Sequence, residues 1–195
     1  MNISAIILAA GQSKRMGQPK MLLPWGNTIV LGKVIETIQL AGIKDILVVT
    51  GGARDKVESF VTSCGIRFTH NKDFANEEML TSIQLGIGGQ KTQSEATLIC
   101  LGDQPQVEER SVRIVCEMFV SNKSSIIVPS YQMRRGHPWL IARELWDEIL
   151  QMRAPESMRE FLNKYKKEIF YIEHDSPSIL QDLDTPEDYL RYKPR

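Results

Sequence analysis

Two glycines and a set of cations directly follow the first apolar run of the chain, in the stretch from residue 8 to residue 20, LAAGQSKRMGQPK. Gly11 and Gly17 permit backbone conformations that other residues avoid. The same stretch carries three cations, which are Lys14, Arg15 and Lys20. Backbone N–H groups and cations at the end of a strand favour an anion site, and phosphate is the usual anion. The stretch is also compatible with a plain strand–turn–helix connection whose cations are solvated.

The spacing of these glycines matches neither of the two common phosphate-binding fingerprints. A P-loop would read GxxxxGK[ST], whereas Gly11 and Gly17 are six positions apart and Lys20 comes three positions later. The dinucleotide fingerprint GxGxxG fails because Ser13 occupies the position of its second glycine. Ser13 itself can donate a hydrogen bond to a phosphate or cap a helix. The stretch therefore suits phosphate without matching either common class of phosphate-binding protein.

Two carboxylates occupy positions that suit a divalent metal. Asp103 follows the apolar run 97–101, within Gly-Asp-Gln-Pro, and Asp184 lies within Asp-Leu-Asp-Thr-Pro-Glu. Mg²⁺ in proteins takes one or two carboxylates together with substrate phosphates and waters. Taken singly, Asp103 fits a turn before Pro105, and Asp184 fits a turn or a helix cap. Their combination with a cationic glycine turn favours the metal.

The histidines and cysteines give weaker signals. His137 lies within Arg-Arg-Gly-His-Pro, where it can contact an anionic substrate or shape the turn. His70 and His174 have no partners at ligand spacing. The three cysteines are far apart and form no CxxC pair, so neither a zinc site nor a disulfide framework is indicated. The sequence also gives no support to a Ser-His-Asp or Cys-His arrangement.

Strands and helices are expected to alternate along the chain. Apolar runs predict strands at 4–9, 46–49, 66–69, 96–101, 125–128, 137–141 and 169–172. Helical spacing and stop signals predict helices at 29–41, 57–64, 79–86, 108–121, 142–152 and 156–165. A final helix is expected to have Thr185 as its N-cap and Pro186 in its first position.

This alternation predicts a Rossmann-like, three-layer α/β domain that spans residues 1–195. Its sheet is expected to be mostly parallel, with the strand at 137–141 as a candidate antiparallel member. Ligands of such sheets bind at the carboxyl ends of the strands. The glycine turn and Asp103 each follow a predicted strand, so both are expected at that edge.

The composition excludes several classes of function. Hydrophobic residues make up 42% of the 195 residues, so a folded globular protein is expected. Lys plus Arg equals Asp plus Glu at 24 each, which argues against nonspecific nucleic-acid binding. The longest apolar runs are far too short to span a membrane, and no basic segment precedes the first of them. We therefore expect a cytoplasmic protein that binds neither nucleic acid nor membranes.

The motifs together resemble the MobA-like nucleotidyltransferases. The resemblance rests on the glycine turn and on the segments Gly-Asp-Gln-Pro at 102–105, Gly-His-Pro at 136–138 and Asp-Thr-Pro-Glu-Asp at 184–188. These matches occur in the family's order from residue 6 to residue 188. Asp-Gln-Pro and Gly-His-Pro narrow the resemblance to the molybdenum cofactor cytidylyltransferase branch. The guanylyltransferases of this family usually carry Leu-Ala-Gly-Gly where this chain has Leu-Ala-Ala-Gly.

The resemblance implies a fold of the nucleotide-diphospho-sugar transferase type and a reaction between CTP and molybdenum-bound molybdopterin. The products would be the cytosine dinucleotide cofactor and pyrophosphate. Arg15, Lys20 and Asp103 would be catalytic, and Mg²⁺ would be held by Asp103 and Asp184. Arg135 and His137 would face the acceptor. The implied nucleotide-binding residues are Leu8, Ala9, Ala10, Gly11, Ser13, Arg15, Lys20, Ser82 and Asp103.

Other functions stay open from the sequence alone. One alternative is a GTP-dependent guanylyltransferase, and another is a nucleotidyltransferase that acts on a sugar or polyol phosphate. A non-catalytic nucleotide-binding partner of a molybdoenzyme maturation factor is a third, but the presence of both carboxylates and Lys20 speaks against it. A labile product is also compatible with a transient contact with a recipient molybdoenzyme or its maturation factor, although no residue marks one.

Overall fold

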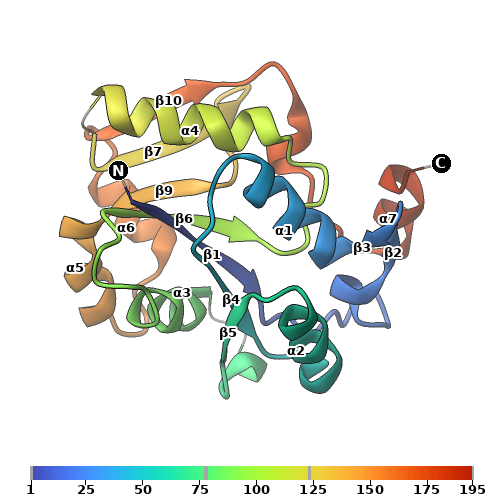
Figure 1. Cartoon of the computed structure of the whole chain (residues 1–195). Helices are drawn as coiled ribbons and strands as arrows, with labels where there is room; N and C mark the ends of the chain where they lie inside the picture. The colour runs from blue at the N-terminus through green and yellow to red at the C-terminus, as the bar shows by residue number, and fades with distance from the viewer. Residues whose placement is uncertain (1, 77–78, 123, 195) are drawn as a thin grey trace.

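Six parallel strands and two antiparallel strands form the main sheet of the computed structural model, which describes residues 2–76, 79–122 and 124–194 (Figure 1). The strand order is β10-β7-β9-β6-β1-β4-β5, with the short β8 paired to β7. The sheet strands are β1 (Ile3–Ala9), β4 (Ile46–Thr50), β5 (Arg67–His70), β6 (Ala96–Leu101), β7 (Ile126–Tyr131), β8 (Arg134–Arg135), β9 (Trp139–Ala142) and β10 (Ile169–Glu173). The predicted mixed sheet is thereby confirmed.

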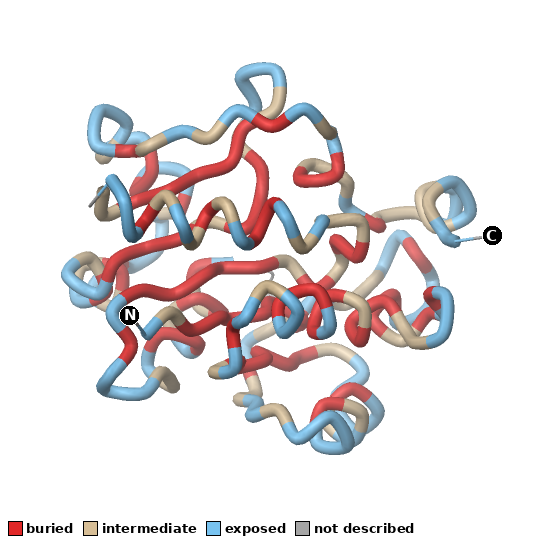
Figure 2. The backbone as a smooth tube through the Cα atoms, turned by 45° about the horizontal axis from the view of Figure 1, so that its top comes forward, coloured by how far each residue is buried: buried red, intermediate tan, exposed pale blue. Residues whose placement is uncertain are grey.

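Helices cover both faces of the sheet, which makes the three predicted layers. The helices are α1 (Val30–Leu40), α2 (Arg54–Ser63), α3 (Met79–Gly88), α4 (Glu109–Asn122), α5 (Trp146–Gln151), α6 (Met158–Lys164) and α7 (Pro186–Tyr192). Successive residues of a strand point to opposite faces. On β1, Ala5 and Ile7 therefore join a core under α1, α2 and α4, whereas Ile6 and Leu8 join a core under α3, α5 and α6. Figure 2 shows the buried strands running between the partly exposed helices.

The antiparallel strand β9 lies between β6 and β7, with Trp139 opposite Ile99. Because β9 runs against its neighbours, its first residues lie near the carboxyl ends of the parallel strands. The predicted helix at 142–152 is shorter than expected, because β9 extends to Ala142 and a 3-10 turn, η3 (Arg143–Leu145), precedes α5. At the end of the chain, Thr185 caps α7 and Pro186 is its first residue, as predicted.

A small third core ties the beginning of the chain to its last helix. The hairpin of β2 (Pro24–Trp25) and β3 (Thr28–Ile29) was not expected, and it packs against α7. The hydroxyl of Tyr189 on α7 donates a hydrogen bond of 2.8 Å to the carbonyl of Pro24. The buried residues of this core are Met16, Leu23, Trp25, Val30 and Leu183. This core fixes the segment after the glycine turn against the segment that carries Asp184.

The helices of the described segments are short. The longest, α4, has 14 residues, and none of them combines the length and the apolar character that a membrane span requires.

Candidate functional site

The glycine loop, residues 10–19, follows β1 at the carboxyl edge of the sheet and is closed by its own backbone. The Ser13 carbonyl accepts hydrogen bonds of 3.1 Å from the N–H groups of Met16 and Gly17. Ser13 has φ 55° and Gly17 has φ 69°, which is the left-handed region that favours glycine. The Ser13 hydroxyl accepts a hydrogen bond of 3.1 Å from the N–H of Lys20. Ser13 therefore fixes the point where the loop enters the 3-10 turn η1 (Lys20–Leu22).

The end of β4 approaches this loop so closely that two glycines are required. The N–H of Gly52 donates a 3.2 Å hydrogen bond to the carbonyl of Ala10. A Cβ atom on Gly52 would lie 2.8 Å from the carbonyl oxygen of Gly11, and one on Gly51 would lie 2.5 Å from that of Ala10. In the sequence, Gly51 and Gly52 simply come shortly after the strand predicted at 46–49. Their close approach to the loop is a tertiary feature.

The segments after β6 and before α7 run together at the same edge. The N–H of Leu183 donates a 3.0 Å hydrogen bond to the carbonyl of Asp103. The Gln104 side chain, which is 3% exposed, donates a 2.6 Å hydrogen bond to the Asp182 carboxylate. Desolvation, together with the nearby charge of Asp103, raises the pKa of Asp182 to about 6. These contacts bring Asp184 to the same edge as Asp103.

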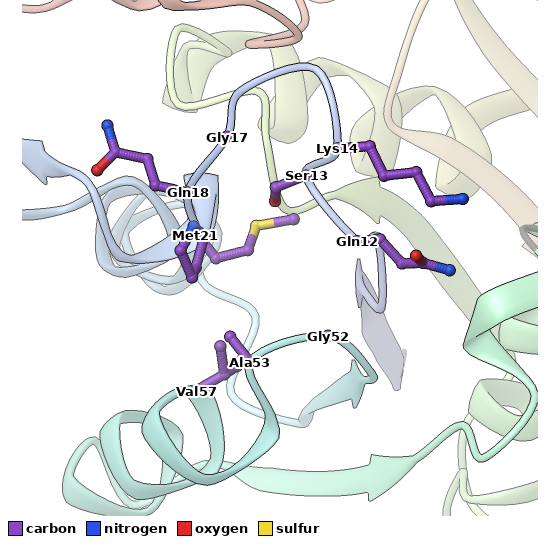
Figure 3. A pocket seen from close by; sticks show the side chains of 11 residues that line it. Gln12, Ser13, Lys14, Gly17, Gln18, Met21, Gly52, Ala53 and Val57 are labelled. Atoms are coloured by element: carbon purple, nitrogen blue, oxygen red, sulfur yellow. The ribbon is translucent and has the colours of Figure 1, made fainter.

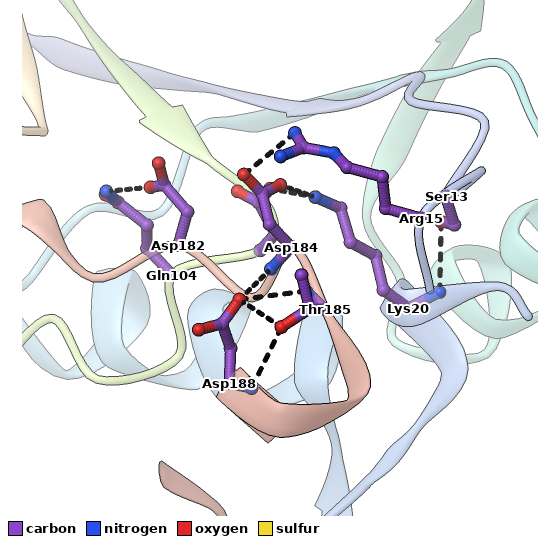
Figure 4. A network of polar contacts seen from close by, with 9 residues as sticks. Ser13, Arg15, Lys20, Gln104, Asp182, Asp184, Thr185 and Asp188 are labelled. Carbon is purple, nitrogen blue, oxygen red and sulfur yellow. Dashed lines mark hydrogen bonds and ion pairs between the residues drawn. The ribbon is translucent and has the colours of Figure 1, made fainter. Parts of the chain in front are cut away.

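The glycine loop and the two predicted metal carboxylates meet in one charge network, formed by Arg15, Lys20, Asp103 and Asp184 (Figure 4). The Lys20 ammonium contacts the Asp103 carboxylate and lies 3.2 Å from Asp184 Oδ1. Arg15 Nη2 donates a 2.9 Å hydrogen bond to the other oxygen of Asp184. Burial disfavours the charged form of Lys20, but the two carboxylates outweigh that cost and raise its pKa above the ordinary value.

A cleft of about 590 Å³ opens above this network. All of the predicted nucleotide and metal residues except Ala9 line it; Ala9 is fully buried in β1. A further hollow of about 330 Å³ lies on the other side of the glycine loop, between the loop and Gly52, Ala53 and Val57 (Figure 3). The lining residues of the cleft that the sequence predicted are Leu8, Ala10, Gly11, Ser13, Arg15, Lys20, Ser82, Asp103 and Asp184.

Asn71 is a cleft residue that the sequence reasoning missed. Its side chain is 2% exposed and donates a 3.0 Å hydrogen bond to the hydroxyl of Ser82 on α3. The same side chain accepts a 2.9 Å hydrogen bond from the N–H of Asp73. Asn71 directly follows β5, so the rule that ligands bind at strand ends was a usable signal. Asn71 fixes the orientation of Ser82 at the wall of the cleft.

Neither predicted acceptor residue lies in the cleft. His137 is 8% exposed, its ring stacks on that of Trp139 with the centroids 4.1 Å apart, and it lines a small hollow together with apolar residues of α1 and α4, among them Val34 and Val112. Its Nδ1 lies 3.1 Å from the Ile99 carbonyl, and burial lowers its pKa to about 4 despite that hydrogen bond. Arg135 donates 3.0 Å hydrogen bonds to the Tyr171 hydroxyl and the Asn163 side chain instead.

The donor set at the network fits a divalent metal that shares its coordination with a substrate. Asp103 and Asp184 both lie within reach of one ammonium group, so one ion replacing that group could contact both. No cluster of three or more His, Cys, Asp or Glu side chains suitable for a metal occurs among the residues described. Mg²⁺ is commonly bound by one or two carboxylates plus substrate phosphates and waters, which matches this set.

A glycine loop after the first strand, facing paired carboxylates at the carboxyl edge of a mostly parallel sheet, defines an α/β protein of the nucleotidyltransferase type. The chain belongs to the MobA-like NTP transferase family, whose domain matches residues 5–169. The protein is accordingly an enzyme of a nucleotidyltransferase family.

Two relatives extend over nearly the whole chain and carry different names. The molybdenum cofactor cytidylyltransferase of Escherichia coli (strain K12) is 29% identical over 194 residues, which cover 99% of this chain and 96% of the relative. The nicotine blue oxidoreductase of Paenarthrobacter nicotinovorans is 28% identical over 200 residues, which cover 97% of this chain and 95% of the relative. Full-length similarity at this level therefore accompanies more than one named activity.

Solved structures share the fold over almost the whole chain. Rv0371c from Mycobacterium tuberculosis H37Rv has a TM-score of 0.85 at 26% identity, covering 98% of this chain and 97% of that one. A nucleotidyl transferase from Methanothermobacter thermautotroptrophicus has a TM-score of 0.83 at 22% identity, covering 98% and 96%. Rv0371c was also crystallised in complex with manganese. The predicted fold of the nucleotide-diphospho-sugar transferase type is confirmed.

Proposed function

We propose that this enzyme transfers CMP from CTP to the phosphate of molybdenum-molybdopterin and releases pyrophosphate. The observation that carries the proposal is the charge network, in which Lys20 and Arg15 of the nucleotide side meet Asp103 and Asp184. The motifs of the cytidylyltransferase branch and the full-length similarity to the Escherichia coli enzyme support CTP and this acceptor.

The glycine loop would hold the triphosphate. Its backbone N–H groups between Ala10 and Gly17 would bind phosphate oxygens at the carboxyl end of β1, apart from those of Met16 and Gly17, which donate to the Ser13 carbonyl. Lys20 and Arg15 would offset the charge that develops on the departing pyrophosphate. Both cations contact carboxylates in the structure, so nucleotide binding would make them exchange those partners for phosphate oxygens. Ser82, held by Asn71, would contact the ribose or the base.

The acceptor oxygen would form a bond to the α-phosphorus while the bond from that phosphorus to the β-phosphate oxygen breaks. A phosphate monoester is already anionic near neutral pH, so little proton transfer is needed. Mg²⁺ held by Asp103 and Asp184 would neutralise charge on the α-phosphate and orient it. The protein residues would contribute mainly by positioning the two substrates and by electrostatic stabilisation.

Pyrophosphate release provides the test. Purified enzyme is mixed with Mg²⁺ and each of CTP, GTP and UTP, and each nucleotide is paired with molybdenum-molybdopterin, a sugar phosphate or a polyol phosphate. We expect release with CTP and the molybdopterin, and none without an acceptor. Faster release with GTP would contradict the assignment of the base. Release with another phosphomonoester but not with the molybdopterin would contradict the acceptor, and tight nucleotide binding with no release would favour a non-catalytic module.

A further inference from the structure

A second cavity, the hairpin cavity, adjoins the cleft and shares Asp182 and Asp184 with it. It has a volume of about 400 Å³ and lies between the β7–β8 hairpin, the 3-10 turn η4 (Pro177–Leu180) and α7. None of its lining residues in the described part of the chain belongs to the glycine loop. The side chains used below are those of Tyr131, Arg134, Asp182, Asp184, Asp188 and Tyr192.

The shared carboxylates place this cavity where an attacking group is needed. In transfer from a nucleoside triphosphate, the attacking and leaving oxygens lie roughly in line on opposite sides of the phosphorus. The glycine loop defines the leaving side, since the pyrophosphate would lie on it. Asp184 marks the neighbourhood of the α-phosphate under the proposed function. The hairpin cavity meets the cleft at Asp184 and has no wall from the glycine loop, so it lies on the attacking side.

Two adjacent arginines of β8 point in opposite directions. Successive residues of a strand face opposite sides, and β8 pairs Arg134 with Tyr131 and Arg135 with Ser130. Arg134 lines the hairpin cavity. Arg135 hydrogen-bonds to Tyr171 and points away from the cavity. The sequence resemblance implied that Arg135, together with His137, faces the acceptor, but the residue that lines this cavity is Arg134.

Arg134 supplies the positive charge in the hairpin cavity. It is the single cation among the described residues that line it, and its side chain makes no hydrogen bond or ion pair with any described residue. Asp188 is already engaged, because its carboxylate accepts hydrogen bonds from the backbone N–H and the hydroxyl of Thr185. A guanidinium without a partner is suited to a phosphate or carboxylate group, which it can bind with two parallel hydrogen bonds.

The hairpin that carries Arg134 is held in place from β10. Gln132 and Met133 form its tip, with φ 49° and 63°, which non-glycine residues rarely adopt. The Glu173 carboxylate accepts hydrogen bonds of 2.8 Å from the Ser130 hydroxyl and 3.1 Å from the N–H of Gln132. These bonds fix the end of β7 and the tip of the turn, and the pairing of Arg134 with Tyr131 fixes the other end. Arg134 is therefore presented to the cavity by a backbone that is anchored rather than free.

We propose that the hairpin cavity is the acceptor subsite and that Arg134 binds an anionic group of the acceptor. The inference rests on the proposed function, since it takes the cleft as the nucleotide site. The remaining walls, with the carboxylate of Asp182 and the phenols of Tyr131 and Tyr192, suit an acceptor whose body carries N–H or O–H donors. The substrate class is a phosphomonoester with a hydrogen-bonding body.

The adjacent arginines provide a matched pair of variants, Arg134→Gln and Arg135→Gln. For each, the KM of the acceptor is measured at saturating nucleotide, and the Kd of the nucleotide is measured by calorimetry. We expect Arg134→Gln to raise the acceptor KM at least about tenfold and to leave the nucleotide Kd within about twofold. Arg135→Gln should leave both values within about twofold. An unchanged acceptor KM in Arg134→Gln, or a larger effect in Arg135→Gln, would overturn the proposal.

A second measurement needs no turnover, so it separates this inference from the proposed function. Phenylglyoxal modifies accessible arginines, and mass spectrometry gives the rate at each residue. Inorganic phosphate should slow the modification of Arg134 more than that of Arg135. Protection of Arg134 in an enzyme that releases no pyrophosphate would contradict the proposed function and support the anion subsite. Equal rates with and without phosphate would overturn the subsite, whatever the enzyme transfers.

Discussion

The cleft and the buried turn before β9 have opposite effects on the charge of a buried basic side chain. In the cleft, Lys20 lies charged between Asp103 and Asp184, and its pKa is raised. Before β9, His137 is equally inaccessible, with 8% of its surface exposed, but its pKa is lowered to about 4. The register of β9 on β6 puts both sites near the same edge of the sheet.

The difference lies in what the rest of the chain brings to each side chain. Lys20 receives a carboxylate from the end of β6 and another from the segment before α7. His137 receives one backbone carbonyl, the stacked ring of Trp139 and the apolar side chains of two helices. Burial favours the neutral form of both groups, and only a counter-charge reverses that preference. Nearness to the carboxyl edge therefore does not make a titratable residue part of the site.

The largest effect is expected from removing a carboxylate of the network. Asp103→Asn should lower turnover by at least about a thousandfold, because it removes a metal ligand and the main partner of Lys20. Its unfolding midpoint should change far less than its turnover, because Lys20 keeps Asp184 as a counter-charge. Asp45→Asn is the matched control, since Asp45 pairs with Arg67 and Lys91 away from the cleft. Pyrophosphate release measures turnover, and urea unfolding measures the midpoint. An equal loss of turnover in Asp103→Asn and Asp45→Asn would contradict the assignment of Asp103 to the site.

Removing the cation should separate metal binding from turnover. Lys20→Met should lower turnover by about a hundredfold, because the charge on the leaving group is no longer offset. The same change should tighten Mn²⁺ binding about tenfold in the absence of nucleotide, since the ammonium that contacts both carboxylates is gone. Mn²⁺ binding is followed by electron paramagnetic resonance. Lys33→Met, which affects only a helix-surface pair with Glu36, is the control.

Because His137 is buried outside the cleft, we expect its titration to change the stability of the fold and not the rate of catalysis. Its pKa is near 6.5 in the unfolded chain and about 4 in the fold, so the unfolded state binds more protons between these values. Stability therefore falls as the pH falls through this range. When the pH is lowered from 7.5 to 5, the free energy of unfolding of the unsubstituted protein should fall by about 2 kcal/mol more than that of the His137→Asn variant. Urea unfolding at the two pH values measures this difference.

Two results would contradict that assignment of His137. Equal losses of stability in the two proteins would mean that the imidazole is not held neutral. A tenfold rise in the acceptor KM of His137→Asn at constant stability would place the ring against the substrate, and the contrast between the two regions would then disappear.

The smallest effect is expected at the glycine loop itself. Gly52→Ala puts a Cβ atom 2.8 Å from the Gly11 carbonyl oxygen, which is too close for a real contact, so the backbone of the loop has to shift. The nucleotide KM should rise about three- to tenfold with little change in kcat. Gly88→Ala, at the end of α3 with open space around its Cβ, is the control. An unchanged KM would mean that the loop adapts without cost.

The sequence predicted those site residues that carry local signals. The glycine loop and Asp103 each follow an apolar strand. Strand ends in α/β folds form ligand sites, so both could be predicted from their positions in the sequence. The start of α7 at Thr185 and Pro186 could also be predicted, because its signal lies in neighbouring residues. A usable signal for the β2–β3 hairpin was overlooked, since Gly26 and Asn27 form a two-residue connection between its strands.

The remaining site residues depend on tertiary contacts. No sequence pattern indicates that Gln104 donates a hydrogen bond to Asp182, or that Asn71 donates one to Ser82. The choice between Arg134 and Arg135 depends on which face of a two-residue strand meets a cavity. The alternation of side chains between the two faces of a strand cannot be recognised in a strand of two residues. The resemblance to a family does not show either which of the two arginines faces the cavity.

The small core that joins Met16 to Leu183 has a consequence for biosynthesis. Arg15 and its partner Asp184 are 169 positions apart, so at ordinary translation rates the ribosome makes them roughly 10 to 30 s apart. During that interval Lys20 can pair with Asp103, which is made much earlier, but Arg15 has no Asp184 to pair with. The pair of Arg15 and Asp184 therefore forms only after nearly the whole chain has been made.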